Sequence, residues 1–127
     1  MNRVLVVDPD PVARSSLAEL LAGDGYTVRA AAGATEALRI LGEFPADWVV
    51  TDLDLPDLSG KLFIRTVRAW ARKPHVLAYT ARDAGRHVDD AEVVSKPVSY
   101  EGLLAWLDAT SAGRVRRRRD TGQVPTR

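Results

Sequence analysis

Short apolar runs alternate with amphipathic stretches along most of the chain. This alternation is typical of βαβ units, in which helices cover a mainly parallel sheet. Residues 4–7 form a continuous apolar run, as expected for a central strand that is buried on both faces. The runs predicted to be strands are residues 4–7, 26–30, 48–51, 76–79 and 92–95.

Amphipathic stretches with helical spacing follow four of these five runs. The first begins at Pro11, which suits the first turn of a helix, and Asp10 is its candidate N-cap. We predict helices over residues 11–22, about 35–41, 61–72 and about 100–109. The apolar residues expected to face the core are Val12, Leu17, Leu20 and Leu21 in the first helix, Leu62, Phe63, Val67 and Trp70 in the third, and Leu103, Leu104 and Leu107 in the last.

The segment between the fourth and fifth strands is unusual. Residues 81–91 are mostly polar and contain Gly85, with Val88 as the single β-branched apolar residue. Two parallel strands still require a crossover connection. We therefore expect a short or distorted helix here.

Composition indicates one ordinary globular domain, with 46% hydrophobic and 28% charged residues. Residues 1–113 carry a net charge of −4, and the last fourteen residues, with six Arg and one Asp, carry +5. We predict a domain over residues 1–112 and a basic flexible tail or linker over 113–127. The chain has no cysteine, no membrane-length apolar run and no signal-like start, so a cytoplasmic location is expected.

Chemistry-bearing residues close four of the predicted strands. Asp8, Asp52, Thr80 and Lys96 each directly follow one of the predicted strands. Because open α/β sheets bind ligands at the carboxyl ends of their strands, we expect these side chains to converge. Two acids, a hydroxyl and an amine suit a phosphate and a divalent cation, and a carboxylate can attack phosphorus.

With these residues placed, the chain resembles the CheY-like receiver domain of two-component response regulators. The resemblance covers residues 3 to about 110 and rests on the acid at 8, on Asp52 followed by Pro56 and Gly60, on Thr80-Ala81, and on Lys96-Pro97. It implies an α/β, flavodoxin-like, doubly wound five-stranded parallel sheet in the order 2-1-3-4-5, here with a shortened fourth helix. It also implies a cis peptide bond before Pro97.

The resemblance further implies a function. Asp52 is expected to accept a phosphoryl group from a sensor histidine kinase or phosphotransfer protein, with Thr80 and Lys96 contacting that group. Mg²⁺ is the expected cofactor, with Asp8, Asp52 and the backbone carbonyl of Asp54 as ligands and Asp10 as an alternative. Such a domain is a phosphoacceptor rather than an enzyme.

The expected partners follow from the same resemblance. The receiver is expected to pass its signal to an effector protein or output domain. We expect no membrane partner, and no nucleic-acid partner for this domain, because neither a recognition helix nor interleaved aromatic residues accompany the arginine run. A homodimer is left open.

Two positions depart from the pattern of this family. Pro9 stands where members usually carry a second acid, which predicts weakened or altered Mg²⁺ binding. Val93 stands three residues before Lys96, where members tend to place an aromatic switch residue. Both departures, together with the shortened crossover at 81–91, favour an alternative, a pseudo-receiver that signals through protein contacts without phosphorylation.

A remote alternative comes from the spacing of Asp52 and Asp54. It resembles the nucleophile and acid/base pair of haloacid-dehalogenase-like phosphatases. That motif normally lies on the first strand, and 127 residues leave little room for a cap domain.

Overall fold

The structure is a computed structural model that describes residues 2–70, 74–81, 87–88 and 91–115. The chain divides into two compact units, Met1–Pro97 and Val98–Arg127. Of the basic tail predicted over residues 113–127, residues 113–115 belong to a helix, and residues 116–127 lie outside the described residues. In the described part of the chain, no helix has the length and apolar character needed to cross a membrane.

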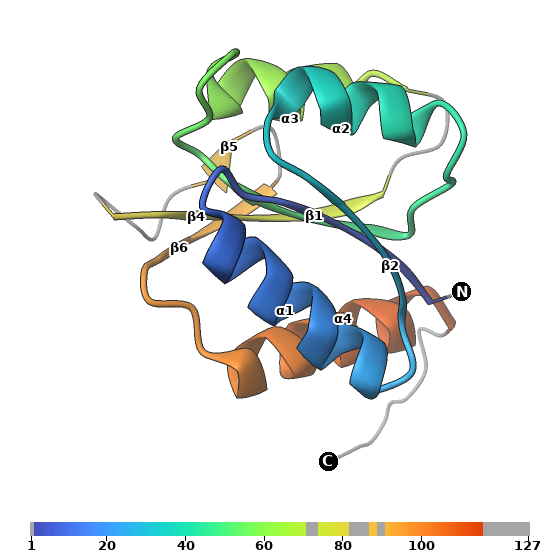
Figure 1. Cartoon of the computed structure of the whole chain (residues 1–127). Coiled ribbons are helices and arrows are strands. Elements are labelled where there is room, and N and C mark those ends of the chain that lie inside the picture. The colour runs from blue at the N-terminus through green and yellow to red at the C-terminus, as the bar shows by residue number, and fades with distance from the viewer. Residues whose placement is uncertain (1, 71–73, 82–86, 89–90, 116–127) are drawn as a thin grey trace. The chain divides into compact units, whose positions relative to one another are not determined.

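The first unit is built on one sheet (Figure 1). Its five parallel strands have the predicted order 2-1-3-4-5, and a short sixth strand lies antiparallel at one edge. The parallel strands are β1 (Arg3–Val7), β2 (Thr27–Ala31), β3 (Trp48–Asp52), β4 (His75–Thr80) and β6 (Ala91–Ser95). The edge strand is β5 (His87–Val88).

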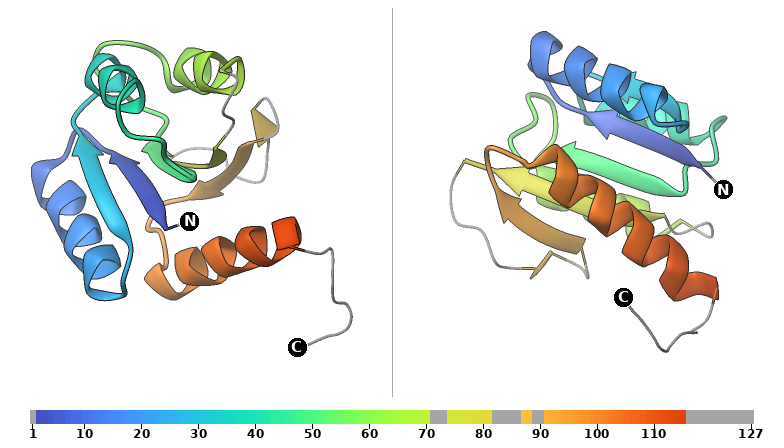
Figure 2. Two further views of the ribbon diagram at one scale, coloured as in Figure 1. Left: turned by 90° about the vertical axis from the view of Figure 1, so that its right-hand side faces the viewer. Right: turned by 90° about the horizontal axis from the view of Figure 1, so that it is seen from below.

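Three helices of this unit cover both faces of the sheet. Helix α1 (Pro11–Gly23) lies on one face, and α2 (Ala34–Leu41) and α3 (Gly60–Arg68) lie on the other (Figures 1 and 2). The doubly wound arrangement expected from the sequence is therefore confirmed. Asp10 is the N-cap of α1, where its carboxylate accepts a hydrogen bond from the backbone N–H of Val12 at 3.0 Å.

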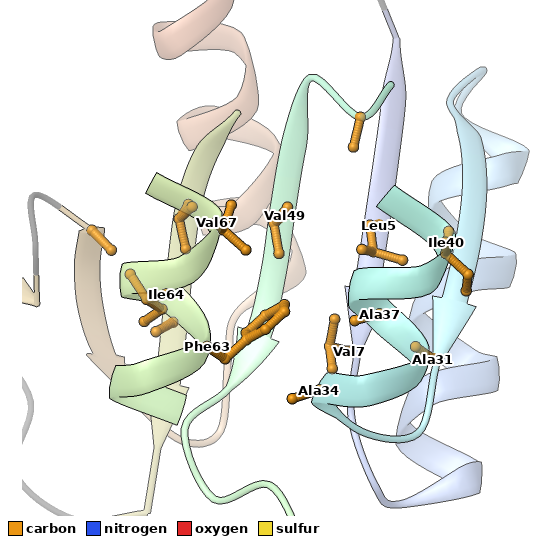
Figure 3. Close-up of a cluster of buried hydrophobic side chains, with 14 of the residues drawn as sticks. Leu5, Val7, Ala31, Ala34, Ala37, Ile40, Val49, Phe63, Ile64 and Val67 are labelled. Atoms are coloured by element: carbon orange, nitrogen blue, oxygen red, sulfur yellow. The ribbon is translucent and has the colours of Figure 1, made fainter. Parts of the chain in front are cut away.

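An apolar cluster fills the space between the sheet and helices α2 and α3 (Figure 3). Phe63, Ile64 and Val67 come from one face of α3, as their helical spacing requires. Each fully buried side chain of this size contributes about 1.5–3 kcal/mol by leaving water. The other labelled members are Leu5, Val7, Ala31, Ala34, Ala37, Ile40 and Val49.

Several predicted core positions are wrong. Val12 is 72% exposed and Leu20 is 50% exposed, whereas Leu21 is buried. Leu62 is 46% exposed because the buried face of α3 begins at the next residue. Helix α3 ends at Arg68 rather than residue 72, and Trp70 is half-buried in the bend that follows.

Within the crossover between β4 and β6, where the sequence predicted a short or distorted helix, two of the described residues form a strand. His87 and Val88 form β5, which pairs with Glu92 and Ala91 of the neighbouring strand. This pairing satisfies backbone groups at the edge of the sheet. Residues 82–86 and 89–90 of this predicted element lie outside the described residues.

The described part of the second unit is one helix, α4 (Tyr100–Val115). Leu103 and Leu107 are buried and Leu104 is half-buried. The helix continues past the predicted end near residue 109. Thr110 fits within it because its hydroxyl donates hydrogen bonds to the carbonyls of Trp106 and Leu107 at 2.8 and 3.1 Å.

Candidate functional site

The four strand-terminal residues predicted to form a site lie at one edge of the sheet in the first unit. Asp8 directly follows β1, Asp52 and Thr80 are the last residues of β3 and β4, and Lys96 directly follows β6. These strands are neighbours in the order β1-β3-β4-β6. The parallel topology therefore delivers the four residues to adjacent positions, and three of them, Asp8, Asp52 and Thr80, are buried.

Asp52 and Lys96 form a direct ion pair. The Nζ atom of Lys96 lies 2.7 Å from Oδ2 of Asp52, whose side chain is 3% exposed. The other carboxylate oxygen, Oδ1, accepts a hydrogen bond from the backbone N–H of Asp54 at 2.8 Å. The hydrogen bond to Asp52 raises the pKa of Lys96, and the charges of Asp8 and Asp54 add to this rise. The amine therefore stays protonated beside the buried acid.

Asp8 is held by two hydrogen bonds to its carboxylate. The backbone N–H of Asp10 donates to Oδ1 at 2.9 Å, and the hydroxyl of Tyr79 donates to Oδ2 at 2.7 Å. The guanidinium of Arg14 donates to the backbone carbonyl of Asp8 at 2.8 Å. These contacts fix the buried Asp8 anion in one orientation.

Tyr79 is a site residue that the sequence analysis missed. It precedes Thr80 on β4, is buried, and lies opposite Asp52 in the strand pairing. Burial raises the pKa of its hydroxyl, and the hydrogen bond to Asp8 raises it further, so the phenol remains a donor. The Lys96 amine lies 5.5 Å from the centre of its ring. A hydroxyl-bearing aromatic residue at the end of a buried strand was the available signal.

The other predicted residues of the site are Thr80, Asp54 and Asp10. Thr80 is buried at the end of β4, and its carbonyl accepts a hydrogen bond from the backbone N–H of Lys96 at 2.8 Å. Asp54 is exposed and contributes its backbone N–H to Asp52. Asp10 is exposed and its carboxylate caps α1, so the N-cap prediction for this residue is confirmed. The Lys96–Pro97 peptide bond is cis, as the resemblance implied.

The loop after Asp52 is tied to helix α2 by Asp57. The two carboxylate oxygens of Asp57 accept hydrogen bonds from the backbone N–H groups of Ala34 and Thr35, both at 2.9 Å. These bonds, the one from Thr35 first, lower the pKa of Asp57 to about 2. The same loop is closed by Gly60, whose N–H donates to the carbonyl of Leu53 at 3.1 Å.

The donors present are those that a hard divalent cation prefers. Two buried carboxylates, Asp8 and Asp52, lie on adjacent strands with the exposed acid Asp54 nearby. Among the described residues, no group of three or more His, Cys, Asp or Glu side chains is arranged to hold a metal ion. Mg²⁺ is commonly bound through one or two carboxylates with several waters. The oxygen donors at this edge therefore fit Mg²⁺ better than a metal that requires several protein side chains.

A sheet of this order, with acids, a hydroxyl and an amine at its carboxyl edge, defines the class of CheY-like receiver domains. A family model described as the response regulator receiver domain matches residues 4–108. The chain belongs to this family, whose members are the receivers of two-component systems.

Curated relatives support the same assignment. The chain is 35% identical over 113 residues to response regulator MprA of Mycobacterium ulcerans (strain Agy99), covering 84% of this chain and 49% of the relative. It is also 35% identical over 114 residues to transcriptional regulatory protein KdpE of Mycobacterium tuberculosis (strain ATCC 25618 / H37Rv), covering 86% and 50%. The chain thus spans about half the length of the curated relatives it matches.

Solved structures share the fold. The chemotaxis response regulator CheY4 of Vibrio cholerae has a TM-score of 0.77 at 27% identity, covering 86% of this chain and 98% of that one. Response regulator TrrA of Thermotoga maritima, in complex with Mg²⁺–BeF, has a TM-score of 0.75 at 28% identity, covering 86% and 98%. A structure of histidine kinase ThkA in complex with TrrA matches with a TM-score of 0.75 at 26% identity, covering 86% and 97%.

Proposed function

We propose that this receiver accepts a phosphoryl group on Asp52 from a histidine kinase. The observation that carries the proposal is the buried Asp52 carboxylate held by Lys96 at 2.7 Å, at the carboxyl edge of the sheet. An Asp52 oxygen would attack the phosphorus of a phosphohistidine, and the P–N bond would break with its electron pair going to the imidazole. The product is an acyl phosphate on Asp52.

Each neighbouring group has a role in this transfer. Lys96 pairs with the negative charge of Asp52 and would pair with the incoming phosphoryl oxygens. The Thr80 hydroxyl would donate a hydrogen bond to the same group. Asp8, Asp52 and the carbonyl of Asp54 would hold Mg²⁺, which would neutralise charge on the transferring phosphoryl group.

The free energies of the Thr80 and Lys96 contacts are of the size that a switch requires only near their upper values. Moving a two-state equilibrium from 1:99 to 99:1 requires about 5.5 kcal/mol. A charge-assisted hydrogen bond from Thr80 contributes roughly 1.5–3 kcal/mol, and a Lys96 pair has a Coulomb attraction of at most about 4 kcal/mol before desolvation. Lys96 already contacts Asp52, so only its added attraction to the phosphoryl group counts. Thr80 would therefore supply much of the free energy that shifts the equilibrium after phosphorylation.

A pseudo-receiver that signals by protein contacts is the second candidate. Asp8 already accepts a hydrogen bond from Tyr79 at 2.7 Å, and Pro9 supplies no carboxylate beside it. Val93 is buried in β6 and offers no aromatic ring that could change its exposure. The comparisons give no support to the phosphatase alternative, since the receiver family match covers residues 4–108.

Incubation with acetyl phosphate and Mg²⁺, followed by intact mass measurement, tests the proposal. The expected result is a mass increase of one phosphoryl group on the wild-type chain. Asp52→Asn should show none, and Asp108→Asn, an exposed acid on α4, should behave as wild type. If the wild type shows no increase with acetyl phosphate or with a phosphorylated histidine kinase, the proposed function fails and the pseudo-receiver is favoured.

A further inference from the structure

Tyr79 is linked to both buried acids of the site, to Asp8 directly and to Asp52 through Lys96. Its hydroxyl donates to Oδ2 of Asp8 at 2.7 Å, and its ring lies 5.5 Å from the Lys96 amine that pairs with Asp52. The hydrogen bond joins residues 71 positions apart in the chain. Tyr79 therefore touches both the acid of β1 and the amine that serves the acid of β3.

The bond between Tyr79 and Asp8 has the features of a strong one. Both residues are 4% exposed, so water competes little with the contact. The distance of 2.7 Å is a usual one for a hydroxyl donor and also falls within the range of bonds to a carboxylate. A backbone N–H of Asp10 occupies the other oxygen, Oδ1. Each carboxylate oxygen of Asp8 thus accepts a hydrogen bond from a protein donor.

A divalent cation would have to share Asp8 with this hydroxyl. A carboxylate oxygen carries two lone pairs, and the phenol uses one of those on Oδ2. Pro9 adds no second acid at the end of β1, so Asp8 is the carboxylate that this strand provides. An approaching cation gains less from an oxygen that already donates electron density to a phenol proton.

We propose that Tyr79 is a positioning residue that holds Asp8 and competes with a divalent cation for its carboxylate. This inference rests on the proposed cation site of the receiver. It assigns to Tyr79 a weakening of cation binding that is separate from the one expected from the absence of a second acid.

Removing the hydroxyl tests the competition directly. Tyr79→Phe should bind Mg²⁺ about tenfold more tightly than the wild type in isothermal titration calorimetry, which corresponds to about 1.4 kcal/mol. Tyr26→Phe is the matched control, because Tyr26 packs edge-on against Trp48 at the opposite end of β3. Its Mg²⁺ affinity should equal that of the wild type.

Two further measurements separate positioning from a merely structural role. Adding Mg²⁺ should produce a tyrosine ultraviolet difference signal in the wild type and Tyr26→Phe, and none in Tyr79→Phe. In an Asp8→Asn background, Tyr79→Phe should leave the Mg²⁺ affinity unchanged. An unchanged or weaker affinity in Tyr79→Phe, or a wild type without the difference signal, overturns the inference.

These measurements do not depend on phosphoryl transfer. If Tyr79→Phe binds Mg²⁺ more tightly but acetyl phosphate never modifies Asp52, the inference stands and the proposed function fails. If Asp52 is phosphorylated while the two proteins bind Mg²⁺ equally, the proposed function stands and the inference fails. If neither protein binds Mg²⁺, the inference is overturned.

Discussion

The buried carboxylate of Asp52 is paired with Lys96, whose side chain is partly exposed to solvent. The carboxylate side chain is 3% exposed and the Lys96 side chain is 38% exposed. Solvent around the Lys96 amine screens the ion pair and weakens it. The Asp52 carboxylate is buried, however, so water does not replace the amine when Lys96 is removed. The loss of Lys96 therefore costs more than the loss of a surface ion pair.

Lys96→Met should lower the free energy of unfolding by about 1–2 kcal/mol, between the values for exposed and fully buried pairs. The pKa of Lys96 is raised in the fold, so its contribution is complete below the ordinary value of 10.5 and is lost as pH rises above it. Urea unfolding at neutral pH and above pH 10.5 measures this. The difference in free energy of unfolding between the wild type and Lys96→Met should be smaller at the higher pH. A difference that does not change with pH would contradict a stabilising role for the charged amine.

Gly60 is required by a close approach of the backbone. A Cβ atom at this position would lie 2.5 Å from the Leu53 carbonyl oxygen and 2.6 Å from its Cα atom. Gly60→Ala should therefore destabilise the domain by about 1–3 kcal/mol. Gly23→Ala is the matched control, because nothing lies within 4 Å of its Cβ position at the end of α1. Thermal melting should show a lower melting temperature for Gly60→Ala and an unchanged or higher one for Gly23→Ala.

Single residues also show what the sequence could reveal about the site. Asp8, Asp52 and Lys96 could be predicted because each closes an apolar run, and parallel strands bring such ends together. For Tyr79 the sequence offered only a hydroxyl-bearing aromatic residue at a strand end, because its contact with Asp8 depends on how far the side chain reaches past β3. Asp57 could not be predicted, since an exposed loop acid looks the same in the sequence whether or not it caps a helix.

Among the helices, α2 depends on a distant residue for its start. Its N-cap is Gly33, which has no side chain to accept a hydrogen bond. Asp57 supplies the missing acceptor from the loop after β3, binding the N–H groups of Ala34 and Thr35. An acid at this position also interacts favourably with the positive end of the helix dipole.

Asp57→Ala should lower the melting temperature at neutral pH, because the first turn of α2 loses its acceptor. These hydrogen bonds lower the pKa of Asp57 from 3.8 to about 2, so the stabilisation is present above 3.8 and is lost as pH falls through about 2. Melting curves between pH 2 and 7 measure the difference from the wild type. It should vanish towards pH 2, and Asp108→Ala should show no such pH-dependent difference.

Element boundaries were harder to predict than element types. Strands and helices of the first unit follow from apolar spacing, but α3 ends before Trp70 and α4 continues through Thr110 to Val115. In the first case an apolar residue lies beyond the helix. In the second, backbone and hydroxyl hydrogen bonds continue the helix after the apolar pattern stops. Neither outcome is encoded in hydrophobic spacing alone.

For the first unit as a whole, the site is only as rigid as the core beneath it. Phe63 and its neighbours on α3 pack with residues of β1 and β3, the strands that position Asp8 and Asp52 (Figure 3). Because the same cluster joins the sheet to both helices of that face, a cavity there weakens the support of both acids.

Phe63→Ala should destabilise the domain by about 3–5 kcal/mol, as expected for a fully buried aromatic side chain. Leu62→Ala, next to it but exposed, should change stability by less than about 0.5 kcal/mol. Urea unfolding followed by tryptophan fluorescence measures both. Equal effects of the two substitutions would contradict the placement of α3.

Both edge strands of the sheet carry features that oppose pairing with a strand of another molecule. On one margin, the hairpin strand β5 already occupies the backbone groups of β6 at Ala91 and Glu92. On the other, β2 presents the exposed charge of Arg29. A strand from another molecule would have to displace β5 on one edge or pack beside the Arg29 guanidinium on the other. Both features oppose aggregation through the sheet edges.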